Sequence, residues 1–269
     1  MTFSIKIFQS FVLGLCIGSF LNVVIYRLPK NLSIIKPRSF CPKCKNKIPW
    51  FSNIPLLSYL FQKGECLFCN TKINFQYPLM ELLTGVLFVI FGFSSPYFYS
   101  YVFNYPLENL FSWIFLSLLV VISFIDFENM WIPQSLINFG YITGLVNLIN
   151  IEFFKSDLFE AKIFLKGIYG ALGAYVFFEL LRFFSKLYYR KDALGKGDSK
   201  LVSMMGLWLG PLGIFLAIGI AYVVAALFLL TLLQLKKIKK NQLIPFGPFL
   251  SFGGLVVWYF GNEFLINLF

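Results

Sequence analysis

Long runs of apolar residues, separated by short polar segments, fill most of the chain. The runs lie at about 7–26, 78–98, 107–125, 133–151, 163–185, 201–233 and 246–266. Several of them approach or exceed the roughly 18–20 apolar residues that a helix needs to cross a bilayer. They are too long and continuous for the alternating strands of an outer-membrane barrel. The pattern therefore predicts an all-α polytopic membrane protein.

The run at 201–233 differs from the others in its length of 33 residues. The sequence GPLG, from Gly210 to Gly213, lies near the end of its first third, and glycine and proline together are typical of a turn. We expect this run to form a tight hairpin with a short first helix. Counted in this way, the chain has about eight transmembrane helices.

The first run, at 7–26, is too long for the core of a signal peptide and lacks a following small-residue cleavage site. We therefore interpret it as a transmembrane helix. Gly14, Gly18 and Asn22 recur in it at a spacing of four and share one helix face. Such a face predicts close packing against another helix, with Asn22 hydrogen-bonded to the neighbour.

The distribution of lysine and arginine predicts the orientation in the membrane. Residues 27–77 form the largest polar interruption and carry nine of the 23 basic residues. Because short cytoplasmic segments are enriched in Lys and Arg, we place this segment in the cytoplasm and the N-terminus outside. The turn at 126–132 and the loop at 186–200 are then cytoplasmic too. We expect three parts: a first transmembrane helix at 1–29, a cytoplasmic four-cysteine zinc-binding domain at 30–77, and a membrane-embedded domain at 78–269.

Composition and charge narrow the possible functions. The chain has 269 residues, of which 58% are hydrophobic, and a net charge of +11. The basic residues fall between apolar runs, so membrane topology and membrane lipids explain them better than nucleic-acid binding, and we expect no nucleic-acid partner. The absence of histidine excludes Ser-His-Asp and Cys-His catalysis and His-ligated metal catalysis. Acid–base chemistry near neutral pH must come from carboxylates, Lys, Tyr or Cys.

Four of the five cysteines form two C-x-x-C pairs with 21 residues between them, Cys41 with Cys44 and Cys66 with Cys69. This spacing is close to that of a four-thiolate zinc knuckle. A pair of disulfides is one alternative, but it would require the opposite topology because the cytosol is reducing. A redox role is another. Four ligands leave no open position, so we expect the Zn²⁺ to be structural.

Acidic residues inside or at the edge of transmembrane helices are costly and by default suggest function. The candidates are Glu81, Asp126, Glu128, Glu179 and Asp198. Asp126 follows directly after the third apolar run, and Asp198 lies just before the sixth. The predicted topology places both at the cytoplasmic edge of the membrane, at the ends of different helices. Folding could therefore bring these two carboxylates together.

Two carboxylates that share a site cannot both ionise easily, so they hold one proton between them. In an aspartic protease the ionised Asp takes a proton from water, and the protonated Asp polarises the scissile carbonyl. Gly195 and Gly197 would let the backbone approach an extended peptide or adopt positive φ. Lys196 and Lys200 would favour the ionised form of Asp198 unless they point to lipid phosphates.

Spacing alone leaves three interpretations of Asp126 and Asp198 open. They could form the catalytic pair of a peptidase. They could serve a proton- or cation-coupled membrane transporter that uses intramembrane aspartates. They could also be structural, and Asp198 is well placed to be the N-cap of a helix.

Several sequence motifs occur together and span nearly the whole chain. They are the two C-x-x-C pairs, GSFLNVVIYRLP at 18–29, YPLMELLTG at 77–85, IDFENMWIP at 125–133, GKGDSKL at 195–201 and IPFGPFLSFGG at 244–254. With this set the chain resembles the type IV prepilin leader peptidases, polytopic aspartic peptidases that often also act as N-methyltransferases. One departure is Gln134, where many members of that family carry Asp.

The resemblance implies that Asp126 and Asp198 are the catalytic pair. It implies prepilin or pseudopilin substrates, in which a short basic leader precedes a hydrophobic helix. Cleavage would fall on the cytoplasmic side of the bacterial inner membrane, typically after a Gly. The resemblance also implies methylation of the new N-terminal residue with S-adenosylmethionine, although the sequence contains no Rossmann fingerprint. Glu81 matches a family acid to which we assign no role, and Gln134 lies outside the expected dyad, so we expect cleavage to persist.

Overall fold

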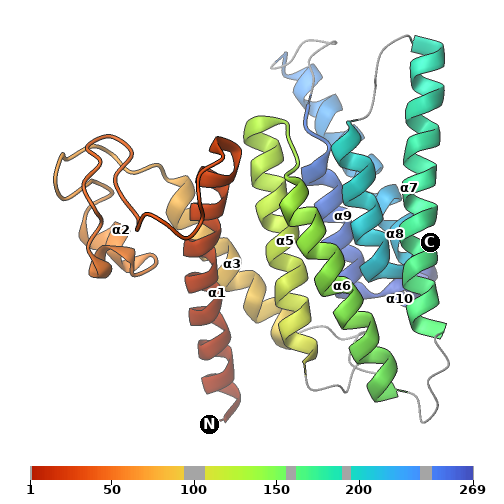
Figure 1. The fold of residues 1–269 in the computed structure, drawn as a ribbon, viewed down its shortest axis with the longest axis horizontal. Helices are drawn as coiled ribbons and strands as arrows, with labels where there is room; N and C mark the ends of the chain where they lie inside the picture. Colours follow the sequence, from red (N-terminus) through yellow and green to blue (C-terminus); the bar gives the residue numbers. More distant parts are fainter. Residues whose placement is uncertain (1, 94–106, 156–161, 190–194, 237–243, 269) are drawn as a thin grey trace. The chain divides into compact units, whose positions relative to one another are not determined.

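The computed structural model describes residues 2–93, 107–155, 162–189, 195–236 and 244–268 (Figure 1). The chain divides into two compact units, Met1–Ser94 and Ser95–Phe269. Most of the described residues are helical and none form a strand longer than an isolated β-bridge, in agreement with the predicted all-α class; the segment between Lys30 and Gln76 has little regular structure. Five of the described helices are long and apolar enough to cross a membrane, and two further apolar helices are shorter. The total of eight crossings stays a prediction.

In the first unit, helices α1 (Thr2–Arg27) and α3 (Gln76–Phe93) pack against each other. Glycines permit this approach, because a Cβ on Gly14 would lie 2.7 Å from the Thr84 carbonyl oxygen and one on Gly18 would overlap the Thr84 hydroxyl. On the same face of α1, the Asn22 side chain donates to the Tyr77 carbonyl at 3.0 Å. The predicted packing face with its polar anchor is confirmed.

The segment between α1 and α3 contains only short helices. These are η1 (Leu28–Lys30), η2 (Trp50–Asn53) and α2 (Leu57–Phe61). Of the hydrophobic residues from 28 to 75, only Cys41 is buried, while Trp50 and Phe61 are exposed. The segment therefore has no apolar core of its own, as is typical of small domains that fold around a metal.

The second unit consists of α5 (Glu108–Asn129), α6 (Gln134–Lys155), α7 (Lys162–Tyr189), α8 (Lys196–Gln234), α9 (Gly247–Phe260) and α10 (Asn262–Leu268), as Figure 1 shows. Aromatic rings join four of them. Trp208 of α8 stacks on Phe115 of α5 with 4.8 Å between ring centroids and meets Trp258 of α9 edge-on at 5.8 Å. The Trp208 indole N–H donates to the Gly140 carbonyl of α6 at 3.0 Å. These buried contacts hold together the helices that carry the polar site described below.

Helix α8 reverses direction within its 39 residues. At Gly210 φ is 71° and ψ is −179°, a conformation that only glycine adopts readily, and Pro211 follows directly. A straight helix would separate Asp198 from Tyr222 by about 36 Å. Both residues nevertheless line one cavity. The chain therefore turns back at Gly210, as the predicted hairpin requires, and its first limb is the shorter one.

The last apolar run, expected at 246–266, does not form a single helix. Helix α9 ends at Phe260, and Gly261 takes a φ of 77° before the short α10 begins. Continuous hydrophobicity predicted one helix here, but a glycine with positive φ ends it because its backbone cannot continue the helical hydrogen-bond pattern.

Candidate aspartyl site and four-cysteine cluster

Asp126 lies in the last turn of α5, and only 5% of its surface is exposed. The helix ends at Asn129 because Met130 adopts the left-handed conformation and donates its N–H to the Asp126 carbonyl at 2.8 Å. The Asp126 carboxylate accepts a hydrogen bond from the backbone N–H of Gly247 at 2.9 Å. Gly247 begins α9, so the positive end of that helix dipole also faces the carboxylate.

Asp198 lies in the first turn of α8 and is 9% exposed. Gly195 is the N-cap residue of this helix, and the Asp198 carboxylate reaches back to accept its N–H at 3.2 Å. Asp198 therefore contributes to capping from the third helical position. The expectation that it could itself be the N-cap is wrong, because the helix begins at Lys196, one turn earlier than that role would require.

The two glycines of the GKGD sequence do not adopt the positive φ that was one expectation for them, and their approach to a peptide stays a prediction. Gly195 has φ of −69°, and Gly197 is helical, so neither uses the positive φ that glycine permits. Within the chain both permit close packing. A Cβ on Gly195 would lie 3.1 Å from the Asp198 carboxylate, and one on Gly197 would lie 3.1 Å from the Ile132 side chain. Small residues here let α8 start directly against the turn that follows Asp126.

One cavity, with a volume of about 1310 Å³, contains both aspartates in its wall. The rest of the wall comes from the turn before α6, the first turn of α6, α7, both limbs of α8 and the segment before α9. The structure thus brings together the two acids that the topology placed at the ends of different helices.

This arrangement is suited to acid–base chemistry on a bound substrate. The cavity exceeds the roughly 300–1,000 Å³ of pockets for small molecules, so it has room for a segment of peptide. Two buried carboxylates that repel each other hold one proton between them. One can then accept a proton from water while the other donates a hydrogen bond, and neither step needs a histidine or a metal ligand.

The lysines beside Asp198 are exposed, and Lys200 donates to the side-chain oxygen of Gln134. Within the described residues, neither Lys196 nor Lys200 forms an ion pair with Asp198. Gln134 lines the cavity and also donates to Asn138 at 2.7 Å. Gln134, the residue at which the chain departs from the family motif, therefore lies in the cavity wall and is hydrogen-bonded to Lys200.

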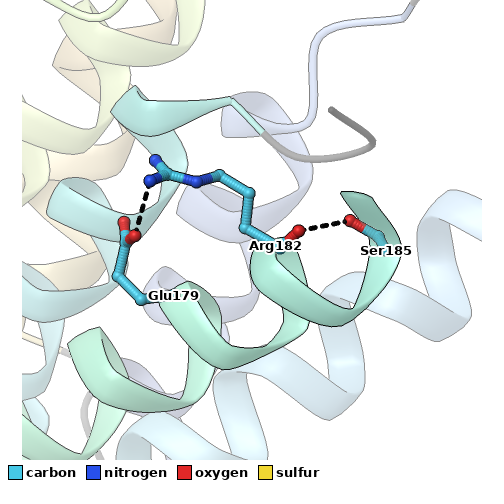
Figure 2. A network of polar contacts seen from close by, with 3 residues as sticks. All are labelled: Glu179, Arg182 and Ser185. Carbon is cyan, nitrogen blue, oxygen red and sulfur yellow. Dashed lines mark hydrogen bonds and ion pairs between the residues drawn. The ribbon is translucent and has the colours of Figure 1, made fainter. Parts of the chain in front are cut away.

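The other three candidate acids lie in different surroundings. Glu128 is exposed on α5. Glu81 is 8% exposed in α3 and accepts the backbone N–H of Leu56 at 2.8 Å, which ties α3 to the cysteine-bearing segment. Glu179 lines the aspartyl cavity and forms an ion pair with Arg182 at 2.7 Å on the same helix, as Figure 2 shows.

The four cysteines of the C-x-x-C pairs form one cluster. The Sγ atoms of Cys41, Cys44, Cys66 and Cys69 all lie within 4.8 Å of one another, and those of Cys41 and Cys69 are 3.9 Å apart. Four thiolates about 2.3 Å from a central Zn²⁺ would be close to 3.8 Å apart, so the cluster fits a tetrahedral metal. All four are free thiols rather than disulfides.

Two similar turns present these thiols. In the first, the Lys45 N–H donates to the Cys41 carbonyl and the Cys41 N–H to the Asn46 carbonyl. In the second, the Asn70 N–H donates to the Cys66 carbonyl, and the Cys66 N–H donates to the Thr71 carbonyl. Lys45 and Asn70, directly after each pair, both take positive φ. The Thr71 hydroxyl, 3.2 Å from the Cys69 sulfur, is the largest of several contacts that lower the pKa of that thiol to about 6, whereas the neighbouring sulfurs raise the pKa of Cys44 to about 11.

Sequence reasoning missed two residues that position these sites. Arg27, only 4% exposed at the end of α1, donates through its guanidinium to the carbonyls of Ser33, Ile34, Pro37 and Arg38. Gly247 supplies the N–H that holds Asp126. Both residues lie in the motifs quoted above. However, the backbone N–H of Gly247 and the hydrogen bonds of Arg27 to loop carbonyls leave no distinctive pattern in the sequence.

Comparison with known proteins gives matches over both units. A family model described as the bacterial peptidase A24 N-terminal domain matches residues 12–94, and one described as the type IV leader peptidase family matches 113–230. A prepilin leader peptidase/N-methyltransferase of Klebsiella pneumoniae is 39% identical over 74% of this chain and 83% of the relative. One of Neisseria gonorrhoeae is 32% identical over 92% of this chain and 88% of the relative.

A further relative with the same name, from Myxococcus xanthus, is 37% identical over 77% of this chain, and the match spans 58% of that relative's length. None of the solved structures matches the chain. The first family model contains the four cysteines, and the second contains both aspartates. The fold and the site define a helical membrane peptidase. This chain belongs to the type IV leader peptidase family.

Proposed function

We propose that this protein is a membrane aspartic endopeptidase that removes the basic leader from type IV prepilins or pseudopilins. The observation that carries the proposal is the single cavity in which Asp126 and Asp198 lie together. Family membership and the names of the relatives support the same reaction. The comparisons give no support to a transporter.

In the proposed mechanism the two aspartates act as a pair on one water molecule. The ionised carboxylate accepts a proton from the water, whose oxygen attacks the scissile carbonyl carbon. The protonated carboxyl donates a hydrogen bond to the carbonyl oxygen and stabilises the charge that develops there. The proton then passes to the leaving amine as the C–N bond breaks. Gly247 orients Asp126 and Gly195 orients Asp198, so both carboxylates are held before substrate arrives.

We propose that the cavity faces the cytoplasm of a bacterial cell, at the edge of the inner membrane. The basic segments at 27–77 and 186–200 support this orientation through the positive-inside rule. A substrate whose hydrophobic helix lies in the membrane would then present its leader junction at the level of the two aspartates. The membrane-embedded part at 78–269 performs the cleavage in this proposal, and the parts at 1–29 and 30–77 anchor the cysteine cluster.

We propose that Zn²⁺ occupies the four-cysteine cluster and has a structural role. The mutual distances of the sulfur atoms support a tetrahedral site, and four thiolates leave no position for a reacting water. When bound, the ion supplies the folding free energy that the segment at 30–77 lacks in apolar burial. Cys41, Cys44, Cys66 and Cys69 are the proposed ligands.

A second activity, N-methylation of the new N-terminal residue, rests on the names of the relatives. In this proposal S-adenosylmethionine supplies the methyl group. No residue of the chain is assigned to that cofactor. The test is transfer of a labelled methyl group to a cleaved pilin by the purified protein.

The proposed cleavage is tested with the detergent-solubilised protein and a prepilin. Asp126→Asn and Asp198→Asn keep the side-chain shape, and each should reduce the cleavage rate by at least about 10²-fold. Glu128→Gln is the matched control, because it removes a negative charge from the exposed face of the same helix that carries Asp126. Thermal unfolding would show that all three variants are folded. Cleavage at the wild-type rate by both aspartate variants would refute the proposal.

A further inference from the structure

One face of α7 forms part of the wall of the aspartyl cavity. Glu179, Arg182, Phe183 and Lys186 all line the cavity. Their spacing of three and four residues places them on a single side of the helix. Of the described cavity-lining residues, Glu179 is the acid that stands outside the proposed dyad. Glu179 has no role in the proposed cleavage mechanism.

Glu179 is engaged by a neighbour on its own helix. The Arg182 guanidinium lies 2.7 Å from its carboxylate, and Figure 2 shows the side chain bending back along α7 to reach it. The two side chains are 23% and 28% exposed, so water and substrate can reach both. An ion pair of this kind contributes little to folding, so either partner can exchange it for an equivalent charge at small cost.

The cavity presents a difficulty to a substrate with a positively charged leader. The ionised member of the dyad is a partner for any lysine or arginine that enters, and such an ion pair would occupy the carboxylate that must accept a proton from water. The exposed Lys186, Lys196 and Lys200 repel the same leader. A second acid in the wall, away from the dyad, would bind the leader charge and leave the dyad available.

We propose that Glu179 is a specificity-determining residue that binds a lysine or arginine of the substrate leader. In this proposal Arg182 holds the Glu179 carboxylate when no substrate is present, and the leader cation displaces it. The inference rests on the proposed function, because it names the group that recognises that reaction's substrate.

The two halves of the ion pair should then have opposite effects on KM. Glu179→Gln removes the group that binds the leader and should raise KM by about fivefold, as expected for one partly exposed ion pair, with kcat little changed. Arg182→Gln removes the competing cation and should lower KM. A merely structural ion pair would give changes in the same direction for both variants, since either change breaks it.

Two controls make the measurement specific. Lys166→Gln removes a positive charge from α7 outside the cavity, so its KM should equal that of the wild type. A prepilin whose leader lysines and arginines are replaced by glutamine should be cleaved with the same KM by the wild type and by Glu179→Gln. Thermal unfolding of each variant would exclude a folding defect.

Every other outcome overturns the inference. Equal increases of KM in both variants would make the pair structural. Reversed signs would mean that Arg182 binds an acidic group of the substrate. Unchanged KM values would mean that the ion pair does not take part in substrate recognition. The proposed function would still hold in that case if the wild type cleaves prepilin and the aspartate variants do not. Absence of prepilin cleavage by the wild type would overturn both proposals together.

Discussion

The backbone N–H of Gly247 donates to the Asp126 carboxylate at 2.9 Å, although 121 residues separate the two along the chain. This bond joins the end of α5 to the beginning of α9. It holds one oxygen of the Asp126 carboxylate and leaves the other oxygen of the same carboxylate for substrate or water. The site therefore depends on a residue outside the region matched by the leader peptidase family model, which ends at residue 230.

Gly247→Ala should strongly reduce cleavage. A Cβ at this position would lie 2.6 Å from the Asp126 carboxylate oxygen, closer than such atoms approach, so Asp126 or α9 must shift. We expect a loss of kcat of about 10²-fold, the size associated with misplacing a catalytic group by about 1 Å. The measurement is prepilin cleavage by the purified variant at saturating substrate.

Gly219→Ala is the control for this substitution. Gly219 lies in the second limb of α8, and nothing lies within 4 Å of the position that its Cβ would occupy. Alanine there should leave kcat unchanged and stabilise the helix slightly. If Gly247→Ala cleaved as fast as Gly219→Ala, close packing against Asp126 would not be required for activity.

Sequence reasoning could predict that Asp126 and Asp198 meet because that inference needs only the side of the membrane on which each helix end lies. It could not predict Gly247 as a partner, because the donor is a backbone group and the contact depends on how α9 packs against α5. For Glu179, the i, i+3 spacing to Arg182 is visible in the sequence. That this helix face lines the cavity depends on the packing of α7 against α8.

In the first unit, too, some contacts could be predicted from the sequence and others could not. The spacing of the cysteines predicted their cluster because metal sites constrain local turns, and both turns lie within a few residues of each C-x-x-C pair. The contacts of Arg27 and Glu81 with backbone groups could not be predicted, because loop conformations decide which carbonyl or N–H groups come within reach.

Gly210→Ala should destabilise the second unit without creating a steric clash. Nothing lies within 4 Å of an added Cβ at Gly210, but the backbone there has φ of 71°, which L-residues rarely adopt. The expected cost is about 1–3 kcal/mol from backbone strain alone. Thermal unfolding in detergent measures it, with Gly219→Ala again as the reference. An unfolding temperature equal to that of the reference would contradict the role of Gly210 in reversing α8.

The cysteine cluster should contain about one zinc ion per chain when the protein is purified without oxygen. Cys41→Ser replaces one thiolate and should lower both the zinc content and the protease resistance of residues 30–77. Cys16→Ser removes the thiol that lies outside the cluster, exposed on α1, and should change neither. Metal analysis and limited proteolysis provide the two readouts. Equal zinc content in the two variants would argue against the proposed ligands.

Arg27 should control the order of the loop that leads into the cysteine cluster. Its guanidinium donates to carbonyls from Ser33 to Arg38, at 2.8 to 3.4 Å, while its own side chain is buried. Arg27→Met keeps the apolar stem and removes all of these donors, so the loop should lose about 1.5–3 kcal/mol of local stability, as for hydrogen bonds to a charged group. Hydrogen exchange of residues 31–48 measures this loss directly.

Arg38→Met is the matched control, because Arg38 lies in the same loop but its side chain is exposed. It removes the same charge and should leave the exchange rates of residues 31–48 unchanged. Faster exchange in Arg27→Met alone would mean that the end of α1 orders this loop through its carbonyl groups. Equal protection in the two variants would mean that the turns around the cysteines hold the loop by themselves, and that the buried guanidinium is not needed for its conformation.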